Sequence, residues 1–292
     1  MINPWQYQIN IEHISAGLTL KDQLIQWRFP RWIRGLLRQQ KRLFINGQLA
    51  STATILKAGD IISFDLFAED FSGLQSYPAN FEATISVVFE DEDYLIIDKP
   101  SGMKMHPHSP NEDDTLLNYA QAYLEKSNSR NAEARAMMTH RLDRNTSGLV
   151  VAAKNPLAVA ILDQMFADKT IKRFYTAEVS HDIEQNEGTI NSPIAVDPQN
   201  PYKRIVSIDG QSAITHFEKI AQRTLKLQLE TGRTHQIRVH LASLGLPIVG
   251  DDLYGGTPAK RMLLDSTEIE IPELFSSRTN FYQKTSNLFD SK

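Results

Sequence analysis

The chain has 292 residues and a formal net charge of −4, with 41% hydrophobic and 23% charged residues. This balance is typical of a globular protein with a sizeable core, either one large domain or a large domain with a small one. No run approaches the ~20 apolar residues of a membrane-spanning helix, and the first residues lack the pattern of a secretory signal. The absence of cysteine excludes disulfides, thiolate catalysis and cysteine-bound metals, and we expect a cytoplasmic protein without membrane attachment.

The N-terminal part has the pattern of a small helix–helix–hairpin unit over about residues 12–70. Residues 18–40 are predicted to be helical, with Pro30 at a helix start and apolar residues at three- to four-residue spacing after it. Asn46-Gly47 then predicts a two-residue hairpin turn, and residues 57–67 predict a further turn and strand.

The predicted helices of this unit are strongly basic, although the whole chain is acidic. Seven basic residues and one acid lie between Lys21 and Arg42. Four of the basic residues recur at helical spacing and form a stripe, called here the basic stripe: Arg31, Arg34, Arg38 and Lys41. Such a stripe is usually a solvated helix face. Because no carboxylate lies nearby in the sequence, we favour a surface that binds phosphates.

A larger α/β region follows a linker that lacks periodicity. We assign residues 1–75 to the N-terminal module, 76–83 to the linker and 84–292 to the larger domain, with 275–292 as a polar, loosely ordered tail. The larger domain begins with a strand, an acidic turn and a second strand. Helices are then predicted over 113–126 and 155–169, and strands over 148–154, 173–179 and 225–230.

Several kinds of site are excluded by the motifs that the sequence lacks. His235 and His240 are five residues apart, no HExxH pair is present, and His106 and His108 flank a proline in a predicted loop. A Gly-x-Ser-x-Gly elbow, a GxxxxGK phosphate loop and a dinucleotide fingerprint are also missing. We therefore expect no metal site and no cofactor, which leaves an enzyme that needs neither, or a protein that is not an enzyme.

Two segments combine charged residues with tight turns. In "HRLDRNTSGLVV", Asp143 precedes a turn and an apolar strand, where an aspartate commonly accepts turn hydrogen bonds. In "ETGRTHQIRVHLASLGLPIVGDDLYG", a strand ends in a Thr-Gly-Arg turn and a helix follows. Arg233 and Arg238 lie at or near the start of this helix, where the helix dipole already favours anions. An aspartate such as Asp143 or a phosphate would satisfy them.

These two segments, taken together, resemble motifs of the RluA-type family of RNA pseudouridine synthases. "VVFEDEDYLIIDKPSGMKMHP" is similar to the opening motif of the family's catalytic domain, and "KRFYTAEV" to its tyrosine-bearing strand. "FINGQLA" and "LKAGDIISF" resemble the S4-like RNA-binding module that often precedes this domain. The resemblance covers roughly residues 15–256. One departure follows, in "RMLLDSTEIE", where Leu264 and Asp265 stand in place of the family's His and Ala.

The resemblance implies an α+β fold, with a mixed, largely antiparallel β-sheet flanked by helices and loops and a small N-terminal S4-like α/β module. It also implies isomerisation of uridine to pseudouridine in structured RNA, without cofactor, by a monomer. The expected substrate is large-subunit ribosomal RNA, with tRNA as the alternative. The reaction moves uracil from an N1–C1′ to a C5–C1′ bond. A single carboxylate can therefore suffice, whereas glycoside hydrolysis, which also activates water, recruits two.

The family's catalytic residues match three positions of this sequence. Asp143 matches the catalytic aspartate, which is expected either to attack C1′ to give a glycosyl ester or to remove a ribose proton to give a glycal. Tyr175 matches the tyrosine placed against the uracil, where it is expected to stack or to take the C5 proton as a base. Arg238 matches the arginine that pairs with the aspartate, and we expect it to favour the charged form of Asp143.

The resemblance also suggests residues that contact RNA around this centre. Ile237 matches an apolar position of the uracil pocket. Arg141 is suited to fill the space that a flipped nucleotide leaves, because its guanidinium is planar. Lys99 and Arg233 are expected to contact phosphates at the cleft edge, and His140 is expected to be structural.

Two other classes of function remain open at this point. One is a catalytically silent RNA-binding protein on the same scaffold, which would have no need of the three catalytic residues. The other is a nucleoside or glycoside hydrolase, for which Asp251 or Asp252 would supply the second carboxylate. Their products differ, since a hydrolase releases free uracil and a synthase retains the isomer in the RNA.

Overall fold

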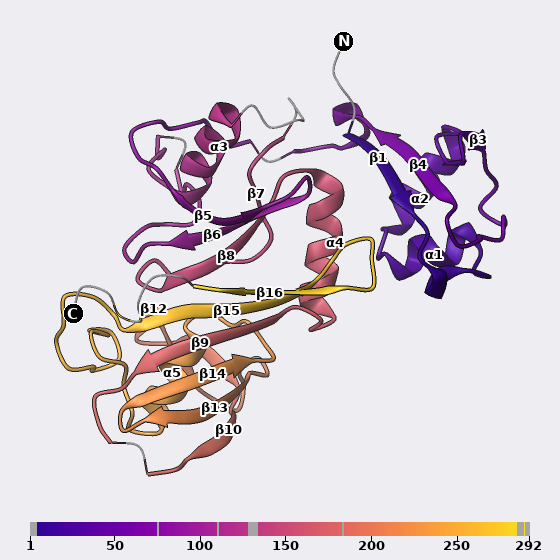
Figure 1. The fold of residues 1–292 in the computed structure, drawn as a ribbon. Coiled ribbons are helices and arrows are strands. Elements are labelled where there is room, and N and C mark those ends of the chain that lie inside the picture. Colours follow the sequence, from indigo (N-terminus) through magenta and orange to yellow (C-terminus); the bar gives the residue numbers. More distant parts are fainter. Residues whose placement is uncertain are drawn as a thin grey trace.

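The structure is a computed structural model that describes residues 5–74, 76–109, 111–127, 134–182, 184–284 and 289. A small N-terminal sheet with two helices lies beside a much larger twisted sheet (Figure 1). The small sheet has four strands in the order β1-β4-β2-β3, and the large one has ten, with β11 (Ile194–Asp197) and β12 (Asn200–Val206) paired separately. In the described part of the chain, no helix has the length and apolarity to cross a membrane.

The N-terminal module has the predicted helices and hairpin. Its elements are β1 (Trp5–Asn10), α1 (Leu20–Gln26), α2 (Arg31–Gln39), β2 (Phe44–Ile45), β3 (Gln48–Leu49) and β4 (Ile61–Leu66). The helix over 18–40 is interrupted before Pro30, where Arg28 adopts a φ of 60°. Asn46 and Gly47 have φ angles of 51° and 76°, which confirms the hairpin turn. β1 was not predicted, and it pairs along its whole length with β4.

The large sheet is mixed and mostly antiparallel, as predicted. Its order is β10-β13-β14-β9-β15-β8-β6-β5, in which only the β15–β8 pair is parallel. The strands are β5 (Ser86–Glu90), β6 (Tyr94–Lys99), β8 (Ser147–Ala153), β9 (Lys172–Glu178), β10 (Glu187–Asn191), β13 (Ile214–Ala221), β14 (Thr224–Leu229) and β15 (Leu264–Pro272). β7 (Met137–Met138) pairs with β8, which is buried throughout.

Three helices flank this sheet: α3 (Leu116–Lys126), α4 (Pro156–Ala167) and α5 (Gln236–Ser243). Asn155 caps α4 by accepting a hydrogen bond from the Ala158 amide, as its sequence predicts. The aspartates before α3 are not caps, because its N-cap residue is Thr115 and no side chain accepts from the first amides there.

The predicted loose tail is wrong for the residues that the structure describes up to 284. β16 (Thr279–Gln283) pairs antiparallel with β15, and Phe275 packs among aromatic rings of the N-terminal module. Its ring centroid lies 5.6 Å from Tyr7 and from Trp27, and 6.1 Å from Phe29. Phe275 and Tyr282 pack against the apolar cluster, and the burial of these two rings stabilises a segment whose other residues are mostly polar. The remainder of the predicted tail, apart from residue 289, lies outside the described residues.

Polar contacts also join the module to the large domain. The Tyr7 hydroxyl donates to Asp93 at 3.0 Å, and Arg28 lies 3.2 Å from Asp168 at the end of α4. Burial raises the pKa of Asp93 to about 6, and Asn155 also donates to this carboxylate. The module is therefore fixed against the domain by a shared apolar cluster and by hydrogen bonds, beyond the chain connection.

Gly148 is required where β8 and β15 run side by side. Its φ is 106°, and a Cβ there would overlap the carbonyl oxygen of Ser266. We expect Gly148→Ala to lower the free energy of unfolding by about 3 kcal/mol or more, since backbone strain and steric overlap both contribute. Urea unfolding of the purified protein measures this loss.

Gly255→Ala is the matched control, because Gly255 has a φ of 84° and no atom within 4 Å of the added methyl. It should cost only about 1–2 kcal/mol, the penalty of the left-handed backbone itself. Equal losses in both variants would contradict the overlap with Ser266.

Candidate active site

Asp143 lies in the loop between β7 and β8, and a second loop, at the end of β6, holds this one in place. The amide of Gly102 donates to the Arg144 carbonyl at 2.8 Å, and Arg144 Nε returns a hydrogen bond to the Gly102 carbonyl at 2.8 Å. Ser101 Oγ donates to the Asn145 carbonyl at 2.7 Å. The backbone directly after Asp143 is therefore fixed to a neighbouring strand end.

Lys99 belongs to this attachment, and its predicted contact with phosphate is wrong. The residue is fully buried, and its ammonium donates to the carbonyls of Pro100, Met103 and Arg144 at 2.9–3.0 Å. Burial lowers the pKa of Lys99 to about 7, although the charge of Asp143 opposes this shift. A side chain without exposed surface, with its donors directed at the backbone, cannot reach a phosphate at the cleft edge.

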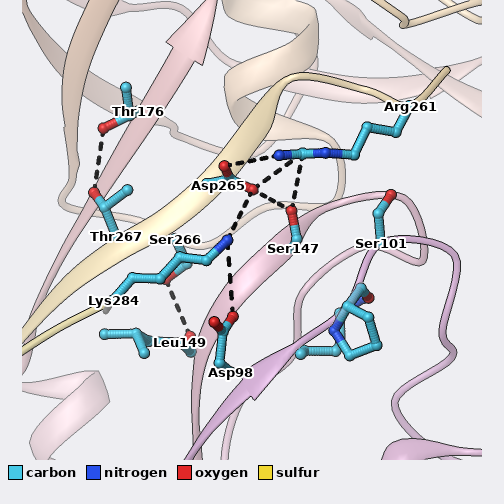
Figure 2. Close-up of polar contacts among 12 residues, drawn as sticks. Asp98, Ser101, Ser147, Leu149, Thr176, Arg261, Asp265, Ser266, Thr267 and Lys284 are labelled. Atoms are coloured by element: carbon cyan, nitrogen blue, oxygen red, sulfur yellow. Dashed lines mark hydrogen bonds and ion pairs between the residues drawn. The ribbon is translucent and has the colours of Figure 1, made fainter. Parts of the chain in front are cut away.

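The start of β8 is fixed by a buried carboxylate, that of Asp265. Ser147 Oγ donates to Asp265, Arg261 lies 3.2 Å from it, and Lys284 Nζ lies 3.6 Å away (Figure 2). Lys284 also lies 3.9 Å from Asp98. Burial by itself would raise the pKa of Asp265, but the hydrogen bonds from Ser147 and Arg261 hold it below its usual range. The departure from the family pattern at this position is thus a structural ion pair.

Arg238 lies on α5 and contacts two carboxylates. Its Nε and Nη2 donate to Asp251 at 2.7 and 2.8 Å, whereas its Nη1 lies 3.5 Å from Asp143. The predicted neighbour Asp143 is therefore present, but the bidentate partner is Asp251, which is 2% exposed. Burial would lower the pKa of Arg238, and the hydrogen bonds with Asp251 raise it above its usual value. The sequence analysis named Asp251 only as a second carboxylate for a hydrolase, and its pairing with Arg238 was not predicted.

His235 is a second residue that sequence reasoning left without a role at the site. It precedes α5 with a φ of 58°, and its Nε2 lies 3.9 Å from Asp143 Oδ2. Its Nδ1 lies 3.0 Å from the Tyr254 hydroxyl, and the ring of Tyr254 lies 5.0 Å from the Arg238 guanidinium. Burial lowers the pKa of His235, so a neutral ring faces Asp143.

A pocket of about 200 Å³ brings together most of the predicted site residues. Tyr175 and Ile237 are each 4% exposed and form apolar walls near the half-buried Asp143. Burial raises the pKa of the Tyr175 hydroxyl. The predicted residues that line the pocket are Asp143, Tyr175, Arg238, Arg141, Ile237 and Arg233, and additional ones include Arg173, His235, Leu229 and Leu264.

The basic stripe lies away from this pocket, with three of its residues on α2 and Lys41 in the turn that follows the helix. Arg31, Arg38 and Lys41 are exposed, whereas Arg34 is half-buried and donates from Nε to the Phe29 carbonyl at 3.1 Å. No ion pair within the described ranges joins any of the four to a carboxylate. The stripe therefore presents uncompensated positive charge.

His140 is half-buried at the wall of the pocket, and its ring nitrogens face the protein. Its Nε2 accepts a hydrogen bond from the Val151 amide at 2.9 Å, and its ring lies 4.7 Å from that of Phe166. Burial lowers the pKa of His140 to about 3, and its Nδ1 is buried without a hydrogen-bond partner.

Comparison with known proteins agrees with this fold. A family profile described as RNA pseudouridylate synthase matches residues 93–243, and one described as the RluD ribosomal pseudouridine synthase N-terminal domain matches residues 7–62. An uncharacterized RNA pseudouridine synthase of Bacillus subtilis is 43% identical over 222 residues, covering 74% of this chain and 71% of that protein. The ribosomal large subunit pseudouridine synthase D of Xanthomonas campestris is 35% identical over 267 residues, covering 89% and 78%.

The human RNA pseudouridylate synthase domain containing 1 has the same fold, with a TM-score of 0.58 at 22% identity, over 72% of this chain and 86% of that one. The fold is that of RNA pseudouridylate synthases, which are isomerases. The chain belongs to the RNA pseudouridylate synthase family, in its RluA-type branch, and carries the N-terminal domain of that branch.

The lowered pKa of His140 predicts a pH dependence of stability. The folded protein keeps the ring neutral, whereas the unfolded chain protonates it below about pH 6.5. Protons therefore bind preferentially to the unfolded state, and stability falls as the pH drops from about 6.5 toward 3. His140→Gln should remove this proton uptake on unfolding. The slope of the free energy of unfolding against pH should therefore be smaller in the variant, by the equivalent of up to about one bound proton.

Urea unfolding at several pH values between 7 and 4.5 measures both slopes. If the slope of the free energy of unfolding against pH is the same in the wild-type protein and the variant, His140 titrates normally in the folded state.

Proposed function

We propose that this protein isomerises specific uridines of large-subunit ribosomal RNA to pseudouridine, with Asp143 as the catalytic carboxylate and without a cofactor. The observation that carries the proposal is the position of Asp143. Its carboxylate reaches a pocket with apolar walls at Tyr175 and Ile237, and the guanidinium of Arg238 lies 3.5 Å away. The relatives named as ribosomal large subunit pseudouridine synthase D, from Xanthomonas campestris and Nitrosomonas europaea, support the choice of RNA.

The pocket favours one carboxylate in the chemistry, because the second is already occupied. Both oxygens of Asp251 accept hydrogen bonds from Arg238, and Asp252 lines a different pocket, with Lys260 and Ser101. A hydrolase would require a carboxylate free to activate water. An isomerisation keeps the uracil and requires no water as nucleophile, so Asp143 alone acts at the sugar, by attack on C1′ or by removal of a ribose proton. The C5–C1′ bond replaces the N1–C1′ bond, and C5 loses its proton to solvent while N1 gains one.

Tyr175 and Arg141 take supporting roles in this proposal. Burial raises the pKa of Tyr175, so its phenol stays protonated near neutral pH, which favours stacking on the uracil over proton abstraction. Arg141 is exposed at the same pocket, two residues before Asp143. A uridine in a stem must leave its stack to reach the pocket, and a planar guanidinium can fill the space that it leaves.

Asp143→Asn tests the catalytic assignment. The amide replaces one oxygen at nearly the same size, so RNA binding should change little while turnover is lost, by at least about 10³-fold. The substrate is large-subunit RNA with tritium at uridine C5, from cells that lack this protein, and release of tritium to water is followed. Free uracil is measured in parallel by chromatography.

Release by the wild-type protein alone, without free uracil, is the expected result. Free uracil would favour the hydrolase, and turnover by Asp143→Asn would contradict the catalytic role of that carboxylate. Binding without release by either protein would favour the silent RNA-binding alternative.

The basic stripe should contribute to RNA binding through phosphates. A variant with glutamine at Arg31, Arg38 and Lys41 should bind RNA more weakly, and the slope of log K against log salt should fall by about 2–3, since each phosphate contact contributes ~0.7–0.9. Substitution is preferable to deletion of the module, because deletion would expose the cluster around Phe275.

The matched control removes three exposed cations elsewhere, with glutamine at Lys126, Lys172 and Arg223. Filter binding at several salt concentrations should give the control a slope close to that of the wild type. If the stripe variant also keeps the wild-type slope, the stripe is only a solvated helix face.

A further inference from the structure

Arg173 lies in the same pocket as Asp143 but has no role in the mechanism above. It is on β9, two residues before Tyr175, so both side chains leave the strand on the same face. Both line the pocket. Arg173 is half-buried, and its Nε is buried without a hydrogen-bond partner.

The charge of Arg173 is uncompensated within the described part of the chain. No hydrogen bond or ion pair joins its guanidinium to another residue there, and its one aromatic contact is the ring of Phe166, at 5.2 Å. The neighbouring buried cations differ, since Arg238 is paired with Asp251 and Lys99 donates to three carbonyls. A guanidinium whose Nε is buried without a hydrogen-bond partner is normally paired, so Arg173 is available to an anion from outside the chain.

The side chain of Arg173 extends toward the pocket rim. Its terminal nitrogens lie beside Gly232, where an added Cβ would be 3.4 Å from Nη2 and 3.6 Å from Nη1. Gly232 is exposed and precedes Arg233, which is exposed and lines the same pocket. The guanidinium is thus located where the backbone of a nucleotide would pass, if its uracil lay deeper, against Tyr175 and Ile237.

We propose that Arg173 binds a phosphodiester group of the flipped nucleotide, at the rim beside Gly232. A phosphate compensates the charge and matches the planar fork of a guanidinium with two parallel hydrogen bonds, whereas a neutral uracil carbonyl would leave the charge unpaired. The proposal deepens the proposed function and rests on it. Arg173 thereby positions the nucleotide while Asp143 acts on its sugar.

The test uses the full chain and a transcript of large-subunit RNA labelled with tritium at uridine C5. Binding is measured at several salt concentrations in the Asp143→Asn background, so that the RNA stays unreacted. Arg173→Gln should lower the slope of log K against log salt by ~0.7–0.9, the contribution of one phosphate. In proteins that retain Asp143, the same substitution should raise KM about 10-fold or more with little change in kcat, because the contact is present before and during the reaction.

Lys172→Gln is the matched control, since it removes one positive charge from the adjacent residue, which is exposed and paired with Glu270. It should keep the wild-type slope and KM. Arg173→Lys keeps the charge but loses the fork, so it should retain the slope and still raise KM. This variant also serves if Arg173→Gln fails to fold, as judged by thermal unfolding.

The proposal is overturned if Arg173→Gln leaves the slope of log K against log salt unchanged. If only Arg173→Lys folds, an unchanged KM in that variant overturns it. A fall in kcat with slope and KM unchanged also overturns it, and would instead place the guanidinium at the reacting base. Failure of the proposed function is distinguishable, because the wild-type protein would then release no tritium from RNA that it binds, while the slopes still report the phosphate contact.

Discussion

A buried carboxylate fastens the strand that follows Asp143, and the geometry of the pocket depends on this attachment. Asp265 joins Ser147 of β8 to Arg261 and to Lys284, which directly follows β16 (Figure 2). Such a group is stable in the interior because hydrogen bonds and opposite charges offset its desolvation. Ser147 lies four residues after Asp143, and Lys99 holds the Arg144 carbonyl between them. The loop that carries Asp143 therefore has little freedom, which keeps Asp143 near Arg238.

The positive charges around the pocket are used in three different ways. Arg238 is bound by Asp251 on one side, so its orientation is set before it faces Asp143. Lys99 donates hydrogen bonds to backbone carbonyls alone. Arg173 and the exposed Arg141 have no carboxylate partner among the described residues, and so they are available to an anionic substrate. This division lets one small site hold its own loop firmly and still attract RNA.

The N-terminal module is fixed to the catalytic domain rather than attached only by a linker. The ring of Phe275, from the segment between β15 and β16, lies among Tyr7, Trp27 and Phe29, and Arg28 pairs with Asp168 at the end of α4. The same α4 supplies Phe166, which packs against His140 and Arg173. The basic stripe thus has a defined position relative to the pocket.

The sequence by itself determined the five helices and about half of the strands in the described part of the chain, because periodicity, caps and turn residues act between near neighbours. Strands such as β10, β13 and β15 were not predicted. The family motifs also identified six residues that line one pocket. Only the tertiary structure decided which charges meet: Asp251 for Arg238, three carbonyls for Lys99, and no partner for Arg173 among the described residues. Phe275 and β16 likewise gained their order from distant contacts. Pairing and burial depend on distances between residues far apart in the chain, and no local pattern encodes those distances.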